Sequence, residues 1–227
     1  MTRGHRIFSQ HRLTASIATG IAVIVVVVAV IAIADSGSSS SAAKAGSNAR
    51  SGPAAGGVVG TISSVSTSSF TVSTSGGQKL TVKKSSSTTY KKGTSSATAS
   101  AIAKGQPVLV LGTVNGSTIT ATQVVVRPPS VGPTTFTPSK VVPFKRGAPS
   151  AAKNDGQIPA NYTEGSGTIV SGTAANKATQ AALAAYPGGV VDRVVKLSNG
   201  EYEVHNIGVN WPHHIFVNKS FEVVGAN

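Results

Sequence analysis

Three histidines near the C-terminus, His205, His213 and His214, are the residues best suited to bind a metal. If the segments that carry them pair as strands, His205 lies opposite His213 or His214, within reach across the sheet. Neighbouring residues of a strand point to opposite faces, so only one of the adjacent pair can join His205. Imidazole binds transition metals, and Glu201 and Glu203 are close enough in sequence to complete a site. The alternative is that these histidines have no metal role.

Basic residues form a second candidate site in residues 57–127, a segment without aspartate or glutamate. They are Lys79, Lys83, Lys84, Lys91, Lys92, Lys104 and Arg127. Such a set is either a solvated face or a contact for an anionic polymer. The segment has only Phe70 and Tyr90 as aromatic residues, whereas proteins that bind single strands stack bases on aromatic platforms. The composition therefore argues against nucleic acid as the partner.

The sequence predicts no enzyme. It has no G-x-S-x-G, P-loop or H-E-x-x-H motif, and seven acidic residues leave little for acid/base chemistry. No cofactor is expected. With no cysteine, the fold is held together without disulfides, and the net charge of +13 suggests anionic neighbours.

The histidines lie in residues 167–227, which predict one helix followed by an antiparallel sheet. Small residues recur at helical spacing over Ala174–Tyr186, with Thr173 as a possible N-cap and Pro187-Gly188-Gly189 as the stop. Four strands are expected over 190–197, 201–207, 213–217 and 221–224. Trp211 is expected in the core, Tyr202 toward the helix with Val204, and Glu203 toward solvent.

This region resembles the PepSY domain of peptidase propeptides. The matching residues are Gly200, Tyr202, Glu203, Val204, Phe216, Val217, Asn218, Phe221, Val223 and Val224. The family usually has Asp and Gly in the last turn, where this chain has Asn218 and Ser220, and no peptidase follows. The resemblance implies binding, and regulation of a secreted peptidase.

Residues 57–127 predict a small all-β domain. Short alternating segments are separated by turn residues, and Asn115-Gly116 joins the expected strands 107–114 and 117–126. A single helical turn is expected within 97–104. The region resembles an uncharacterised bacterial family of small, OB-like barrels. The residues that match are Gly60, Ile62, Val65, Gly105, Val108, Val110 and Gly112.

Residues 13–34 predict one transmembrane helix. They carry no charge, and a helix of that length is about 33 Å long, against a hydrocarbon core of about 30 Å. Arg3, Arg6 and Arg12 precede the span, which places residues 1–12 in the cytoplasm and the C-terminus outside the plasma membrane. The alternative is a cleavable signal peptide cut after Ala34, which would release a secreted protein.

Two linkers separate these parts. Residues 35–56 are rich in Ser, Ala and Gly, and residues 128–166 contain seven prolines among polar and basic residues, which predicts extended, mostly disordered chain. The alanine-rich helix, the VNWPHH segment at 209–214 and the closing VVGA also look like small exported actinobacterial proteins.

Together these features predict a membrane-anchored extracytoplasmic protein of the bacterial cell envelope. We expect it to bind or regulate, with a secreted peptidase or an anionic envelope polymer as partner. One alternative is a passive spacer of the cell wall, from which the loss of residues 168–227 should be tolerated. Another is a metal-handling protein that uses His205 with His213 or His214. The sequence defines no oligomeric state.

Overall fold

The computed structural model describes residues 52–126, 136–148 and 153–227. The predicted membrane span, most of the first linker and Arg127 lie outside these residues. Within them, no helix is both long and apolar enough to cross a membrane. All three ranges belong to one compact unit, Lys44–Asn227.

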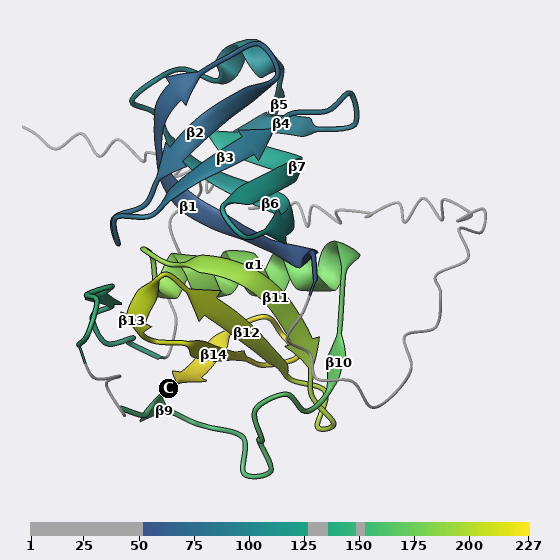
Figure 1. Ribbon diagram of the computed structural model, residues 1–227. Helices are drawn as coiled ribbons and strands as arrows, with labels where there is room; N and C mark the ends of the chain where they lie inside the picture. Colours follow the sequence, from purple (N-terminus) through teal and green to yellow (C-terminus); the bar gives the residue numbers. More distant parts are fainter. Residues whose placement is uncertain (1–51, 127–135, 149–152) are drawn as a thin grey trace, which may run out of the picture. The chain divides into compact units, whose positions relative to one another are not determined.

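The described residues are mostly β, with a small barrel followed by one α-helix and a second group of strands (Figure 1). The barrel region contains β1 (Ala54–Val65), β2 (Ser69–Ser73), β3 (Lys79–Lys83), β4 (Thr89–Lys92), β5 (Ser95–Ala97), the 3-10 turn η1 (Ala99–Ala101), β6 (Pro107–Asn115) and β7 (Thr118–Val126). The rest contains β8 (Val142–Pro143), β9 (Asp155–Gly156), β10 (Thr168–Ile169), α1 (Gly172–Ala185), β11 (Val190–Lys196), β12 (Tyr202–Ile207), β13 (Val209–Trp211), β14 (His214–Val217) and β15 (Val223–Ala226).

The barrel closes in the strand order β1-β2-β3-β7-β6-β1, with β3 and β7 parallel and the other pairs antiparallel. This is the connectivity of an OB-like barrel. Alternate residues of each strand fill the interior, as Leu80 and Val82 do on β3. On β3 the residues between the buried ones face outward and are exposed, which makes them available for other contacts.

Strand β1 joins the barrel strands and the C-terminal strands into one sheet. It pairs with β2 and β6 in the barrel and with β11 beyond it, where Gly57 lies opposite Val191 and Val58 opposite Val190. A Cβ at Gly56 would overlap the carbonyl oxygen of Val191, so glycine is what allows this close approach. The sequence predicted separate domains; the structure connects the barrel to the C-terminal strands through β1.

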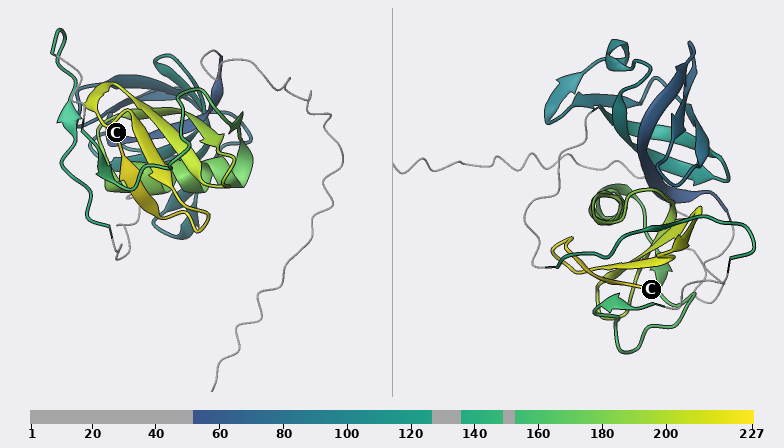
Figure 2. Two further views of the ribbon diagram at one scale, coloured as in Figure 1. Left: turned by 90° about the horizontal axis from the view of Figure 1, so that it is seen from below. Right: turned by 90° about the vertical axis from the view of Figure 1, so that its left-hand side faces the viewer.

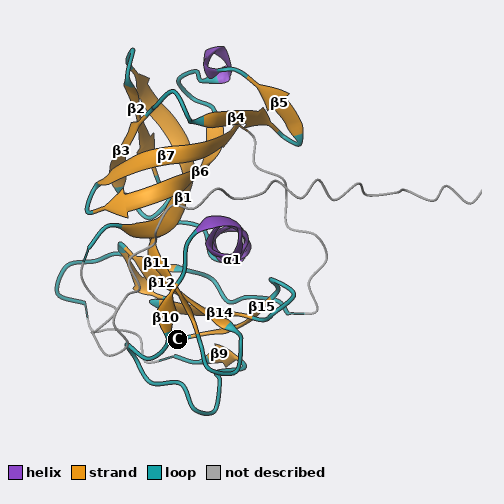
Figure 3. Cartoon of the chain, turned by 90° about the vertical axis from the view of Figure 1, so that its right-hand side faces the viewer, coloured by secondary structure: helices purple, strands orange, loops and turns teal. Residues whose placement is uncertain are grey.

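Helix α1 lies between the outside of the barrel and the sheet β11-β12-β14-β15 (Figures 2 and 3). Ala175, Ala178 and Ala182 are fully buried, because their small side chains let the helix lie close to its neighbours. The same hydrophobic cluster includes Leu109 and Leu111 of β6. The barrel and the C-terminal strands therefore share a core around the helix.

Residues 153–166 cover the other face of the C-terminal sheet. Ile158 and Tyr162 pack against Val195, Leu197 and Phe216 in a separate hydrophobic cluster. Strand β9 pairs with β15 at the edge of the sheet. The described part of the proline-rich segment thus makes specific contacts that its composition did not predict.

The predicted helix and strands are confirmed within one or two residues at most ends. Helix α1 stops before Pro187-Gly188-Gly189 as expected, but its N-cap is Ser171 and not Thr173. The last strand is shifted, since 221–224 was predicted and β15 is Val223–Ala226. Two predicted orientations are confirmed, since Trp211 is in the core and Tyr202 lies on the helix side of the sheet. The prediction that Glu203 faces solvent is wrong, because its side chain is buried.

Candidate functional site

The outward face of β3 carries part of the predicted basic set. Lys79, Thr81 and Lys83 are exposed and alternate with the buried residues of the strand. In OB-like folds, the face of strands 2 and 3 and the loop between strands 1 and 2 bind ligands. Lys84 belongs to this region, because its Nζ donates to the carbonyl oxygen of Ser66, 2.8 Å away in the β1–β2 loop.

The other basic residues lie on different elements. Lys91 and Lys92 are on β4, opposite the end of β7, and Lys104 is in the loop before β6. No acidic side chain is present in 52–126. The predicted set is therefore a lysine pair on β3 supported by Lys84, with the remaining described lysines elsewhere on an acid-free barrel.

Neither aromatic residue of the barrel forms an open stacking platform. Phe70 is 2% exposed and belongs to the barrel core, and Tyr90 packs against that core. That aromatic stacking does not drive ligand binding at the barrel stays a prediction.

The second candidate site is built on β12 and β14. Their register places His205 directly opposite His214, with 5.3 Å between the ring centroids. The prediction that one member of the adjacent pair would face His205 is confirmed, and that member is His214. His213 lies before β14; burial, and then the charges of His205 and His214, lower its pKa.

Each histidine of the cross-strand pair is held by a carboxylate. His205 Nδ1 donates to Asp192 Oδ1 at 2.6 Å, and His214 Nδ1 donates to Glu203 Oε1 at 2.7 Å. Histidines that bind metals commonly donate their other ring nitrogen in this way, which would leave Nε2 for an ion. However, among the described residues no group of three or more His, Cys, Asp or Glu is arranged to hold one. A metal at these histidines stays a prediction.

Tyr162 connects the histidine pair to the segment that covers the sheet. Its hydroxyl oxygen lies 3.0 Å from His214 Nδ1, and its ring meets Phe216 edge-on at 4.7 Å between centroids. Burial, followed by the negative charges of Glu203 and Glu164, raises the pKa of Tyr162. The phenol therefore stays protonated at physiological pH.

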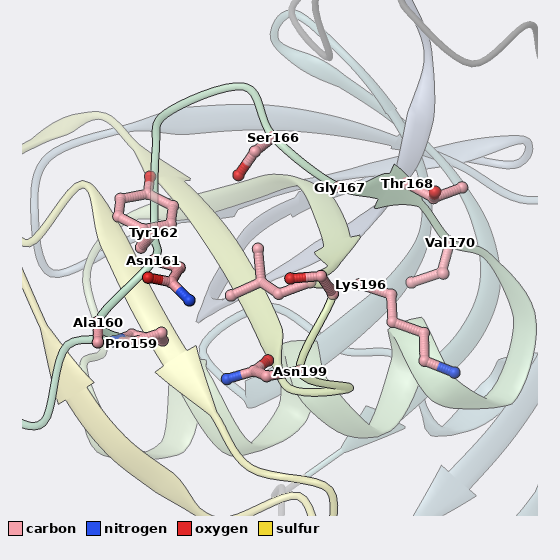
Figure 4. A pocket seen from close by; sticks show the side chains of 12 residues that line it. Pro159, Ala160, Asn161, Tyr162, Ser166, Gly167, Thr168, Val170, Lys196 and Asn199 are labelled. Carbon is pink, nitrogen blue, oxygen red and sulfur yellow. The ribbon is translucent and has the colours of Figure 1, made fainter.

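A pocket of about 760 Å³ opens beside Tyr162 (Figure 4). Its lining residues are Pro159, Ala160, Asn161, Tyr162, Ser166, Gly167, Thr168, Val170, Lys196, Leu197, Ser198 and Asn199. Lys196 is the single charged side chain among them, and the rest are apolar residues, glycine, and residues with hydroxyl or amide groups. The size is in the usual range for small-molecule sites.

The sequence did not reveal Asp192, Tyr162 or Lys196 as site residues. Asp192 lies at an irregularity between Val191 and Arg193, where the alternation of β11 is interrupted. Tyr162 lies in the segment predicted to be disordered. The apolar residues Ile158 and Tyr162 within that polar stretch are the signal that could have indicated a packed segment.

Comparison with known protein families gives a match. Residues 59–125 form a DUF5666 domain. The matching family is described as a domain of unknown function, and the match covers less than a third of the chain. No curated protein and no solved structure was found to match the chain.

The DUF5666 match begins within β1 and ends within β7. It covers the strands of the OB-like barrel and the described lysines of the basic set. It excludes Ala54–Val58, the part of β1 that contains both residues paired with β11. The matched residues thus belong to the barrel and leave out the part of β1 that joins the C-terminal strands.

Proposed function

We propose that this chain is a membrane-anchored, extracytoplasmic binding protein of the bacterial cell envelope, whose barrel contacts anionic polymers. The observation that carries the proposal is the acid-free barrel with Lys79 and Lys83 on the outward face of β3. Phosphate-rich or carboxylate-rich chains would meet both lysines without repulsion from a nearby acid. Residues 13–34 supply the anchor and residues 1–12 stay in the cytoplasm.

The C-terminal part has a regulatory role in this proposal. One helix packed on an antiparallel sheet agrees with the PepSY resemblance, which implies binding to a secreted peptidase. The loss of residues 168–227 does not separate a regulator from a passive spacer, because the barrel shares the core around α1. Deleting residues 168–227 would remove α1 and β11 and expose Leu109 and Leu111, so a deletion would damage the barrel as well.

Substitutions on β3 test the proposal without this damage. We expect the full chain to be retained on immobilised polyglycerol phosphate at low salt and released by about 0.5 M salt, where charges are screened within a few ångströms. The K79Q/K83Q variant should be retained much less. The matched control is K91Q/K92Q, which removes two charges from β4. Equal losses would show a general charge effect, and no loss in either variant would contradict the proposal.

Topology is tested separately. Protease shaving of intact cells should remove the barrel and C-terminal peptides while residues 1–12 stay protected. The intact mass of the membrane fraction then distinguishes an uncut anchor from cleavage after Ala34. Protection of residues 52–227 would contradict an extracytoplasmic location.

The pocket supports a second candidate function, binding of a small organic anion. Lys196 is the single charged residue that lines the pocket. Leu197 and the aromatic ring of Tyr162 offer apolar surface. Titration with the fluorescent dye 8-anilinonaphthalene-1-sulfonate, which has one anionic group and aromatic rings, provides a test. We expect K196Q to weaken dye binding and K219Q, on an exposed turn outside the pocket, to leave it unchanged. Equal dye binding by the K196Q variant and the parent chain would contradict this function.

The metal-handling alternative is tested by calorimetric titration with zinc. Any heat should disappear in H205Q, whose side-chain amide can still donate a hydrogen bond to Asp192. A titration without heat would end this alternative.

A further inference from the structure

Residues 140–146 form an exposed loop with both apolar and basic side chains. Phe144 is 56% exposed and Val142 is 40% exposed. Lys140, Lys145 and Arg146 lie in the same short stretch and are also exposed. No acidic residue occurs between residues 128 and 154.

The base of this loop is fixed on buried residues. In the β8–β13 pair, Val142 lies opposite Trp211 and Pro143 opposite Val209, and both β13 residues are 1% exposed. The backbone N–H of Lys145 donates to Asn210 Oδ1 at 2.9 Å. The base of the loop is therefore tied to the core by backbone contacts and by Val141, while Val142 and Phe144 remain exposed.

Two other large hydrophobic residues with high exposure provide a comparison. Val65 is 43% exposed and Ile169 is 42% exposed, and neither has a charged residue within two positions in the sequence. Single exposed hydrophobic residues of this kind are common on soluble proteins. The 140–146 loop differs because an aromatic, an aliphatic and three basic side chains come together.

We propose that the 140–146 loop docks on an anionic lipid surface. Aromatic rings are favoured at the boundary between head groups and acyl chains, where Phe144 and Val142 would enter. Lys140, Lys145 and Arg146 would meet the negative head groups, and their aliphatic stems can lie along the apolar boundary. The loop contains no acidic residue, so its basic groups are attracted by the negative potential of an anionic lipid surface. A neutral partner would offer no such attraction.

The proposal does not depend on the N-terminal anchor. An anchor at residues 13–34 would hold the chain at a bilayer, whereas the loop determines which surface of the folded part meets the lipid. The two can fail separately. Resistance to alkaline carbonate extraction tests the anchor, and lipid contact at position 144 tests the loop.

The experiment compares tryptophan variants of the full chain bound to vesicles. F144W reports on the loop, and I169W is the matched control because Ile169 is similarly exposed but has no charged residue within two positions in the sequence. Trp211 is present in every variant, so the emission of the parent chain is subtracted. The vesicles contain equal amounts of phosphatidylglycerol and phosphatidylcholine, with or without brominated acyl chains that quench tryptophan.

We expect the F144W emission to shift to shorter wavelength and to be quenched by the brominated lipid, while I169W stays unquenched. Adding K145Q/R146Q to F144W should lower the ratio of docked to undocked loop by about 30-fold. The loss of each basic group near an anionic surface lowers this ratio by a similar factor, and the two factors multiply. Vesicles of phosphatidylcholine alone should give weaker quenching. Absence of F144W quenching, or equal quenching of both tryptophans, would overturn the proposal and leave the loop as a contact for a protein.

Discussion

The Nδ1 atom of His214 lies 2.7 Å from Oε1 of Glu203, and Glu203 is only 2% exposed. A buried carboxylate needs hydrogen-bond donors or a positive partner, because the protein interior solvates its charge poorly. His214 supplies such a hydrogen-bond donor from the opposite strand. The pair therefore matters for the stability of the sheet, whether or not the histidines also bind a ligand.

Replacing His214 by phenylalanine should destabilise the protein strongly. H214F keeps the approximate size of the ring but leaves Glu203 buried without the imidazole donor, and leaving a buried acceptor unsatisfied costs about 1 to 3 kcal/mol, more where the acceptor is charged. H214Q keeps a hydrogen-bond donor and should lose less. Urea unfolding of Lys44–Asn227, followed by the fluorescence of the buried Trp211, measures the difference. Equal stability of H214F and H214Q would contradict the role assigned to the pair.

His213 should make the protein less stable at mildly acidic pH. Burial, and then the charges of His205 and His214, lower the pKa of His213 in the folded chain. The unfolded chain takes up a proton below about pH 6.5, whereas the folded chain does so only at lower pH, so stability falls as the pH decreases from about 6.5. H213Q should reduce this loss. Urea midpoints measured on both sides of pH 6.5 provide the test, and identical pH slopes for the parent chain and H213Q would contradict it.

Local patterns in the sequence were sufficient for most elements. The Asn115-Gly116 turn and the alternation on either side predicted the β6–β7 hairpin, and helical spacing with a Pro-Gly stop predicted α1. The cross-strand position of His205 and His214 also follows from alternation and a short connection. These features depend on residues that are close in the sequence.

The remaining features depend on contacts between distant residues. Val58 and Ile62 alternate in the same way whether β1 pairs with β2 and β6 alone or with β11 as well, so the pairing with β11 left no local signal. Asp192 reaches His205 because the register shifts between Val191 and Arg193, and Tyr162 reaches His214 from a segment that is not a strand. Neither position follows from a regular period.

The junction between β1 and β11 should tolerate no side chain at Gly56. In G56V the new Cβ would overlap the carbonyl oxygen of Val191, so β11 must move away from β1. We expect a loss of more than about 3 kcal/mol, since the shared core around α1 would open. A54V, two residues earlier on the same strand, is the control and should lose much less. Urea unfolding of both variants decides, and a stable G56V would show that the junction can shift without cost.

Asp155 should stabilise the covering segment through the end of α1. Its Oδ2 accepts hydrogen bonds from the backbone N–H of Ser139 at 2.6 Å and from the hydroxyl of the buried Tyr186 at 3.3 Å. The hydrogen bonding from Ser139 is the main cause that lowers the pKa of Asp155, with smaller contributions from Tyr186 and Lys153, while burial opposes the shift. Substitution by alanine removes the acceptor for both donors. We expect D155A to lose about 1 to 2 kcal/mol near neutral pH.

The effect of D155A should depend on pH in a defined direction. Because the pKa of Asp155 is lower in the folded chain, its charge contributes stability above the unfolded pKa of about 3.9, and this contribution is lost as the pH falls through the folded pKa. The difference in unfolding free energy between the parent chain and D155A should therefore be largest at neutral pH and shrink in acid. Hydrogen exchange should show faster opening of residues 153–158 in D155A at neutral pH. A difference that stays constant down to about pH 2, or that grows in acid, would mean that the Asp155 carboxylate does not hold this segment through its charge.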